Sequence, residues 1–269
     1  MTTYPNTWND YLNTPVFVIN LDKSKDRLET SKMRLAERWF KNVIRWKAEE
    51  PTEENISLNW KKYNNPIFDN IDSGFKNQLP KQSCVLSHLN CIEYAIKNNI
   101  KYFTIAEDDL LFHPYTDLFA PLVYDSTPKD YDICYMGSNI AIADSYNGEP
   151  VYFANEDKII CQVPSLCTTW ITYTLEGAKK LFYYIQHDLI GNNSVETLDI
   201  RLWRYMYDMI VHNHKNYFNW YVWNIRSIEK ILTNENKEGF IKLNLPEYSI
   251  MKGEGIVQQD ISFPSLIKL

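Results

Sequence analysis

The chain has 269 residues, of which 45% are hydrophobic and 23% are charged. These values are typical of a soluble globular protein that is long enough to bury a sizeable core. The net charge of −6, with basic residues scattered along the chain, argues against a nucleic-acid-binding protein, which usually carries a basic surface. Five cysteines without a CxxC pair indicate neither a zinc site nor a disulfide framework and favour buried free thiols in a reducing compartment.

The first residues, MTTYPNTWNDYLN, have neither the basic nor the apolar segment of a signal peptide. No stretch reaches the roughly 18 apolar residues that a membrane span requires. We therefore expect no transmembrane segment and a cytoplasmic location.

The first predicted elements form a βαβ unit. The apolar, β-branched run Pro15–Asn20 predicts a buried strand, and Asn42–Trp46 predicts a second one. Between them, Leu28, Leu35 and Trp39 recur at helical spacing, with Asp22 or Ser24 available as a cap. Two strands joined by a helix are expected to lie parallel in one sheet.

A second helix and strand follow a long polar excursion over residues 48–79, in which we expect at most a short helix. Apolar residues at helical spacing predict a helix over Ser83–Lys97, with Pro80 just before it and Asn98-Asn99 at its end. The strand Tyr102–Ala106 comes directly afterwards and leads into the acidic triplet Glu107-Asp108-Asp109.

The rest of the chain continues the α/β pattern. We expect strands at Tyr131–Gly137, Leu166–Tyr173 and Asn219–Ile225, a helix opened by Thr174 with Gly177 near its start, and a helix over 194–208. The tail over about 250–269 has no regular pattern. Because no linker or repeat interrupts the sequence, we interpret residues 1–269 as one domain with a mixed, mainly parallel sheet flanked by helices.

The acidic triplet carries the clearest chemical signal. Three neighbouring carboxylates repel one another, which costs stability unless something compensates, and a bound cation is one candidate. Side chains alternate along a strand, so Glu107 and Asp109 are expected to converge on one site. Ligands of open α/β sheets bind outside the carboxyl ends of the strands. Carboxylate oxygens suit Mg²⁺ or Mn²⁺, which often bridge the phosphates of a nucleotide substrate.

Several motifs, in order, resemble glycosyltransferase family 25, the lipooligosaccharide glycosyltransferases and procollagen galactosyltransferases. VFVINLDKSKDRLE is similar to the family's opening strand and Asp-Arg, and CVLSHLNCIEYAI to its Cys-Phe-Leu-Ser-His helix. IAEDDLLF is similar to its Glu-Asp-Asp strand end, YDICYMGSN to the strand that follows, and CTTWITYTLEGAKKL to a later strand and helix. ETLDIRLW stands where the family has an Asp-containing segment. The set spans about Val16 to Trp203.

The resemblance implies a GT-A-like, Rossmann-type fold and a metal-dependent, inverting transfer of a hexose, galactose or glucose, from a UDP-sugar. The acceptor would be a hydroxyl of a glycan or of a hydroxylysine-type protein side chain. Glu107 and Asp109 would form a DxD-like site for Mn²⁺ or Mg²⁺, and Asp199 would be the general base. The residues expected near the donor are Asn20, Leu21, Arg27, Ser87, His88 and Asp108.

Simpler structural roles remain open for several of these residues. Arg27 could pair with a carboxylate on its own helix, His88 could be a core histidine, and Asp199 could be a solvated helix acid. Ser87 could be an ordinary helix residue. His212 and His214 form an HxH pair that could instead complete a metal site.

The sequence also departs from the family. The family usually has Gly-Glu-x-Gly before the helix cysteine, where this chain has Pro80, Lys81, Gln82 and Ser83. The alternative function is therefore a catalytically inactive relative that binds glycans or protein partners. A nucleotidyltransferase or phosphotransferase would need a glycine-rich phosphate loop or a second acidic cluster, and the chain shows neither.

Overall fold

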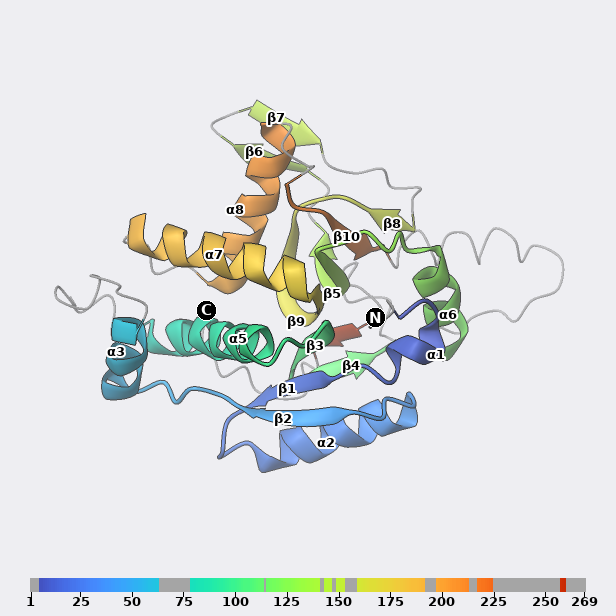
Figure 1. Cartoon of the computed structure of the whole chain (residues 1–269), viewed down its shortest axis with the longest axis horizontal. Helices are drawn as coiled ribbons and strands as arrows, with labels where there is room; N and C mark the ends of the chain where they lie inside the picture. The colour runs from blue at the N-terminus through green and yellow to red at the C-terminus, as the bar shows by residue number, and fades with distance from the viewer. Residues whose placement is uncertain are drawn as a thin grey trace, which may run out of the picture.

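The computed structural model describes residues 5–62, 78–113, 115–140, 143–146, 149–152, 159–191, 197–212, 217–224 and 257–259 (Figure 1). Among these residues no helix is long and apolar enough to cross a membrane. The tail over 250–269, apart from residues 257–259, and the second part of the polar excursion lie outside the described residues.

A seven-stranded sheet forms the centre of the molecule (Figure 1). Its strands are β1 (Val16–Asn20), β2 (Val43–Lys47), β3 (Tyr102–Glu107), β5 (Ile133–Ile140), β8 (Ile160–Cys161), β9 (Ser165–Thr174) and β10 (Trp220–Trp223). They lie in the order β2-β1-β3-β9-β5-β10-β8. β1, β2, β3, β5 and β10 run in one direction, whereas β9 and β8 run against their neighbours. This mixed, mainly parallel sheet confirms the predicted α/β fold class.

Helices cover both faces of the sheet. They are α1 (Trp8–Tyr11), α2 (Lys25–Glu37), α3 (Glu53–Lys62), α5 (Leu79–Lys97), α6 (Thr116–Ser126), α7 (Leu175–Gly191) and α8 (Leu198–Val211). Apolar residues of α5, α7 and α8 pack with one face of the sheet, and those of α1, α2 and α6 pack with the other. Figure 1 shows α2 and α5 on opposite sides of β1 and β2.

Strand β1 explains why the two cores are separate. All five of its residues are buried, as expected for an interior parallel strand. Its side chains alternate between the faces, so that Val16 and Val18 join the core beside α2, while Phe17 and Ile19 join the core beside α5.

Two small sheets lie outside the central one. β4 (Leu110–Phe112) pairs in antiparallel fashion with β11 (Val257–Gln259), and β6 (Ala143–Tyr146) pairs with β7 (Glu149–Tyr152). The sequence did not predict these strands, nor did it predict β8, α1 or α6. The strands and α1 are too short to show a clear periodicity, and Pro121 inside α6 argues against a helix there.

The ends of two helices follow a common pattern. At the end of α2, the Phe40 amide donates to the Leu35 carbonyl, and Trp39 has a φ of 65°. Asn99, at φ 53°, closes α5 in the same way, which confirms the predicted stop. The predicted start of α5 was less accurate, because α5 begins at Leu79 and thus includes Pro80 in its first turn.

Candidate active site

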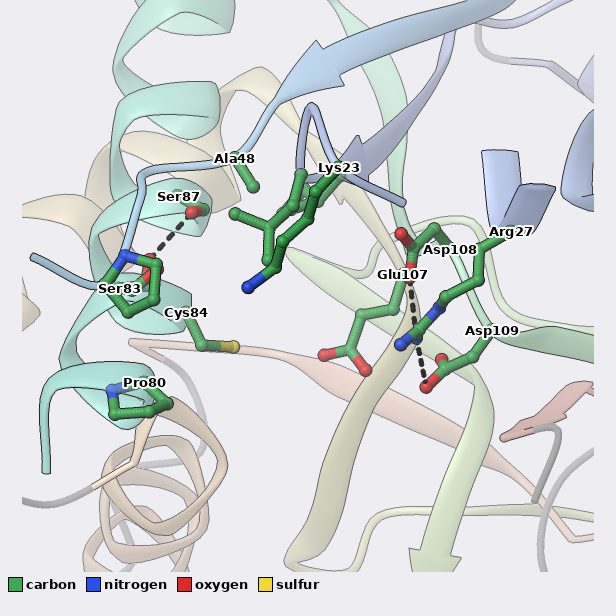
Figure 2. Close-up of a pocket in the computed structure, with 13 residues that line it drawn as sticks. Lys23, Arg27, Ala48, Pro80, Ser83, Cys84, Ser87, Glu107, Asp108 and Asp109 are labelled. Atoms are coloured by element: carbon green, nitrogen blue, oxygen red, sulfur yellow. Dashed lines mark hydrogen bonds and ion pairs between the residues drawn. The ribbon is translucent and has the colours of Figure 1, made fainter. Parts of the chain in front are cut away.

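A pocket lies at the carboxyl ends of β1, β2 and β3, where the topology of an open α/β sheet favours ligand binding (Figure 2). Leu21 follows β1, Ala48 follows β2, and Glu107 ends β3. The first turns of α5 form the opposite wall. The pocket is therefore built from the elements that the sequence predicted around the acidic triplet.

Arg27 joins the two aspartates of the triplet. Its Nη2 lies 2.6 Å from Oδ1 of Asp108 and 2.7 Å from Oδ2 of Asp109, and all three side chains are at most 11% exposed. Arg27 comes from α2, whereas the aspartates follow β3. The guanidinium thus partly compensates the negative charge of the two aspartates. The alternative role considered for Arg27, an ion pair with an acid of its own helix, is not the one that these contacts show.

Glu107 faces a different set of partners. Its Oε1 accepts a hydrogen bond from the Thr168 hydroxyl at 2.5 Å and lies 3.6 Å from Nε2 of His88. Burial alone would raise the pKa of Glu107, but the contacts with His88 and Thr168 and the charge of Arg27 outweigh it and hold the pKa below its ordinary value. Glu107 is therefore a carboxylate at neutral pH.

The pKa of Asp108 is shifted in the opposite direction. Burial raises the pKa of Asp108 above its ordinary value, although Asn20 and Arg27 both favour the charged form. Asn20 donates from Nδ2 to Asp108 at 2.6 Å and accepts from Arg45 through Oδ1 at 3.1 Å. Asn20 thus positions Asp108 and is not itself part of the pocket lining.

Two serines of α5 fix the start of the polar excursion. The Ser87 hydroxyl accepts from the Glu49 amide at 2.8 Å and donates to the Ser83 carbonyl at 2.7 Å, while the Ser83 hydroxyl donates to the Glu49 carbonyl. Both serines line the pocket. The hydrogen bonds show that Ser87 holds the chain after β2 against α5, in addition to any contact with a ligand.

Lys23 and Cys84 also line the pocket, although neither was predicted from the sequence as a site residue. Figure 2 shows the Lys23 ammonium group pointing into the pocket, towards Cys84 and Glu107. Burial, followed by the charges of Glu107, Asp199 and Asp109, raises the pKa of Cys84 well above its ordinary value. A signal for Cys84 existed, because it stands four residues before His88 and so shares its helix face.

Asp199 lies in the first turn of α8 and does not line the pocket. One carboxylate oxygen accepts from the Thr197 hydroxyl and from the Ile200 amide at 3.0 Å. Its charge contributes to the raised pKa of Cys84. The second half of the HxH pair, His214, lies outside the described residues, and His212 is exposed.

The donor atoms of the pocket fit a hard divalent cation. The carboxylates of Glu107 and Asp109 point into the same pocket (Figure 2). Thr168 and Arg27 each engage one oxygen of these carboxylates, Oε1 of Glu107 and Oδ2 of Asp109. Mg²⁺ and Mn²⁺ prefer carboxylate oxygens, which both groups supply.

Comparison with known proteins identifies the reaction class. Residues 13–141 match the model of glycosyltransferase family 25 (LPS biosynthesis protein). This match agrees with the family that the motifs indicated, and it supports glycosyltransferase activity. The matched segment includes the whole acidic triplet but not Asp199. No curated protein matches the chain by sequence.

Among solved structures, the crystal structure of mouse xyloside xylosyltransferase 1 in its apo form is similar to this chain. The identity is 13% and the TM-score is 0.36, over 74% of this chain and 82% of the other. A similarity of this size supports no conclusion about substrate.

Proposed function

We propose that this chain, which belongs to glycosyltransferase family 25 over residues 13–141, transfers a hexose, galactose or glucose, from a UDP-sugar with inversion. The acceptor is a hydroxyl of a glycan or of a hydroxylysine-type side chain, and the reaction depends on Mn²⁺ or Mg²⁺. Residues 1–269 form one glycosyltransferase domain in this proposal.

One observation supports the proposal above the others. The carboxylates of Glu107 and Asp109 and the cations of Lys23 and Arg27 line one pocket at the ends of parallel strands. A sugar nucleotide carries a diphosphate, which needs positive charge, and two carboxylates are a natural means of holding a divalent cation beside it. Glu107 and Asp109 would hold the cation, which would stabilise the charge that develops on the leaving diphosphate.

The side chains of the pocket have distinct tasks in this reaction. Lys23 points into the pocket and would contact a phosphate oxygen directly (Figure 2). Arg27 is held by two aspartates and so presents a fixed cation, with little rotamer entropy left to lose on binding. Asn20 keeps Asp108 in place beneath Arg27. Lys23 and Arg27 thus bind the donor, whereas Asn20 acts only through Asp108.

Asp199 is our candidate for the general base. An inverting transfer needs a group that takes the proton of the acceptor hydroxyl as the diphosphate leaves. Asp199 lies in the first turn of α8, and its charge contributes to the raised pKa of Cys84 in the pocket wall. Asp199→Asn should reduce kcat about 10²–10⁴-fold and leave donor affinity nearly unchanged, because the base acts on the acceptor. An unchanged kcat would remove Asp199 from the mechanism.

The direct test is a panel of UDP-hexoses assayed with and without Mn²⁺. Transfer or slow donor hydrolysis is expected only with the metal and a UDP-hexose. Asp109→Asn should abolish turnover and keep the fold, since the side-chain shape hardly changes. Asp117→Asn is the matched control, because Asp117 pairs with Arg38 on the surface and should behave as wild type. Full activity of Asp109→Asn would contradict the proposed metal site.

A catalytically inactive binding protein is the second candidate, and one observation favours it. Pro80 and Ser83, which replace the glycines of the family pattern, both line the pocket. At these two positions the family has glycines, which expose only backbone atoms, whereas this chain has side chains. This reading predicts metal-dependent UDP binding without turnover of any donor in the panel, whereas measurable transfer would exclude it.

A further inference from the structure

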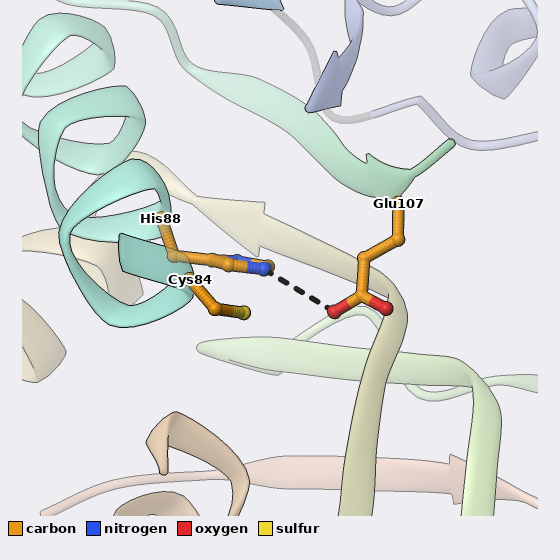
Figure 3. Close-up of side chains that lie close together, drawn as sticks. All are labelled: Cys84, His88 and Glu107. Carbon is orange, nitrogen blue, oxygen red and sulfur yellow. Dashed lines mark ion pairs between the residues drawn. The ribbon is translucent and has the colours of Figure 1, made fainter. Parts of the chain in front are cut away.

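A second group of ligand atoms lies on the α5 side of Glu107. The Cys84 thiol, the His88 ring nitrogens and the Glu107 carboxylate offer one ligand atom each, and these atoms lie within 4.8 Å of one another (Figure 3). Figure 3 shows the Cys84 and His88 side chains extending from α5 towards the Glu107 carboxylate at the end of β3. The three donors are a sulfur, a nitrogen and an oxygen.

His88 is the independent sign that a ligand belongs here. It is fully buried, at 0% exposure, and within the described part of the chain neither ring nitrogen has a hydrogen-bond partner. Its Nε2 points at Glu107 from 3.6 Å, which is too long for a hydrogen bond. An unsatisfied buried polar group costs free energy, and a metal ion bound to the ring nitrogen would remove that cost.

The geometry suits a small tetrahedral ion. Bonds of about 2.0–2.3 Å to nitrogen, oxygen and sulfur place neighbouring ligand atoms roughly 3.3–3.8 Å apart. The His88–Glu107 separation of 3.6 Å already falls in this range. Cys84 and His88 stand four residues apart on one helix face, so only a small side-chain rotation is needed to bring the sulfur closer.

We propose that Cys84, His88 and Glu107 form a three-ligand site for a borderline-soft divalent cation of the Zn²⁺ class, with a fourth position open to the pocket. Sulfur and imidazole ligands select such ions over Mg²⁺ or Mn²⁺. On binding, the Cys84 thiol gives its proton to solvent and its sulfur bonds to the metal.

The site is separate in chemistry from the proposed catalytic metal site but shares Glu107 with it. A bound Zn²⁺ therefore takes one carboxylate away from the catalytic cation and inhibits transfer. The binding itself does not depend on the proposed reaction, so the two ideas fail independently. The sequence indicated no zinc site because it has no CxxC pair, but a mixed set of cysteine, histidine and glutamate ligands does not need one.

Cobalt is the probe of choice, because a thiolate bound to Co²⁺ gives a near-ultraviolet charge-transfer band that oxygen ligands do not give. The metal-free full-length protein should develop this band with one equivalent of Co²⁺ and lose it when Zn²⁺ is added. Cys84→Ser should abolish the band and weaken Zn²⁺ binding by at least about tenfold, since even groups that only orient metal ligands are worth roughly 10–100-fold. Cys91→Ala, on the same helix but in the core, should keep the band.

A second measurement uses the unmodified protein and so does not depend on the folding of a variant. Cys84 and Cys167 are both half-buried, so a thiol reagent can be followed at each by peptide mass. Zn²⁺ should slow alkylation of Cys84 and leave Cys167 unchanged. A wild-type protein without the cobalt band, a band that survives Cys84→Ser, or equal alkylation of Cys84 with and without Zn²⁺ would each overturn the proposal.

Discussion

Replacing Arg27 by methionine tests whether its guanidinium holds the pocket edge together. Arg27→Met keeps an unbranched apolar stem and removes the guanidinium, so that Asp108 and Asp109 lose a partner that both contact through one nitrogen. The two carboxylates are only 7% and 6% exposed. Breaking a buried ion pair by removing one partner costs about 3–5 kcal/mol, because it leaves uncompensated buried charge. This is a large part of the roughly 5–15 kcal/mol that stabilises an ordinary protein.

Arg38→Met is the matched control. Arg38 pairs with Asp117, but these side chains are 20% and 53% exposed, so the pair should contribute no more than about 1 kcal/mol. Urea unfolding of both variants near neutral pH, without added metal, measures the difference in the free energy of unfolding. The cost of Arg27→Met should shrink in mild acid, because the unpaired aspartates can then take up protons. If the two variants lost equal stability, the reasoning would be refuted.

Three smaller predictions concern other parts of the chain. Trp39 has a φ of 65°, which glycine adopts without strain, and its side chain is 70% exposed. Trp39→Gly should therefore raise the free energy of unfolding by about 1 kcal/mol in urea melts. A loss of stability would show that the exposed ring is needed. Hydrogen bonds from Arg45 and then Lys47 lower the pKa of Asp22 to about 2. The charged Asp22 should therefore stabilise the fold at pH values above the ordinary pKa of an aspartate, and this effect should disappear as the pH falls towards 2. A pKa near 4 for Asp22 in an NMR titration would contradict these contacts. Ile92 is fully buried on α5, and Ile92→Ala should cost roughly 2–5 kcal/mol in the same melts, whereas a loss under about 0.5 kcal/mol would mean that this helix face is not packed.

The sequence predicted the elements that carry the acidic triplet because their patterns are local. β3 is a continuous apolar run, and α5 has apolar residues at helical spacing. The acids follow β3 directly in the sequence, so their position at the end of a strand could be predicted. All three acids line the pocket, because Asp108 and Asp109 lie in the turn after β3, where the alternation of a strand no longer applies. The stop of α5 at Asn99 was equally readable, since it depends on a single residue that tolerates positive φ.

The contacts between side chains within the site could not be predicted from the sequence in the same way. Arg27 meets two aspartates that lie about eighty positions further along the chain, and no local pattern distinguishes them from an acid on its own helix. Tyr11 is a similar case. It lies in a four-residue helix, yet its hydroxyl contacts the hydroxyls of Thr104 and Thr172 at 2.8 and 2.7 Å in the core. Such contacts depend on the order of strands in the sheet, which local periodicity does not specify.

Isothermal titration of UDP into the metal-free protein, before and after addition of Mn²⁺, tests the central claim most directly. We predict measurable heat of binding only with Mn²⁺ in the wild type, and none under either condition for Asp109→Asn. UDP that bound equally well without metal, or that bound Asp109→Asn as tightly as the wild type, would contradict a metal-dependent sugar-nucleotide site at the end of β3.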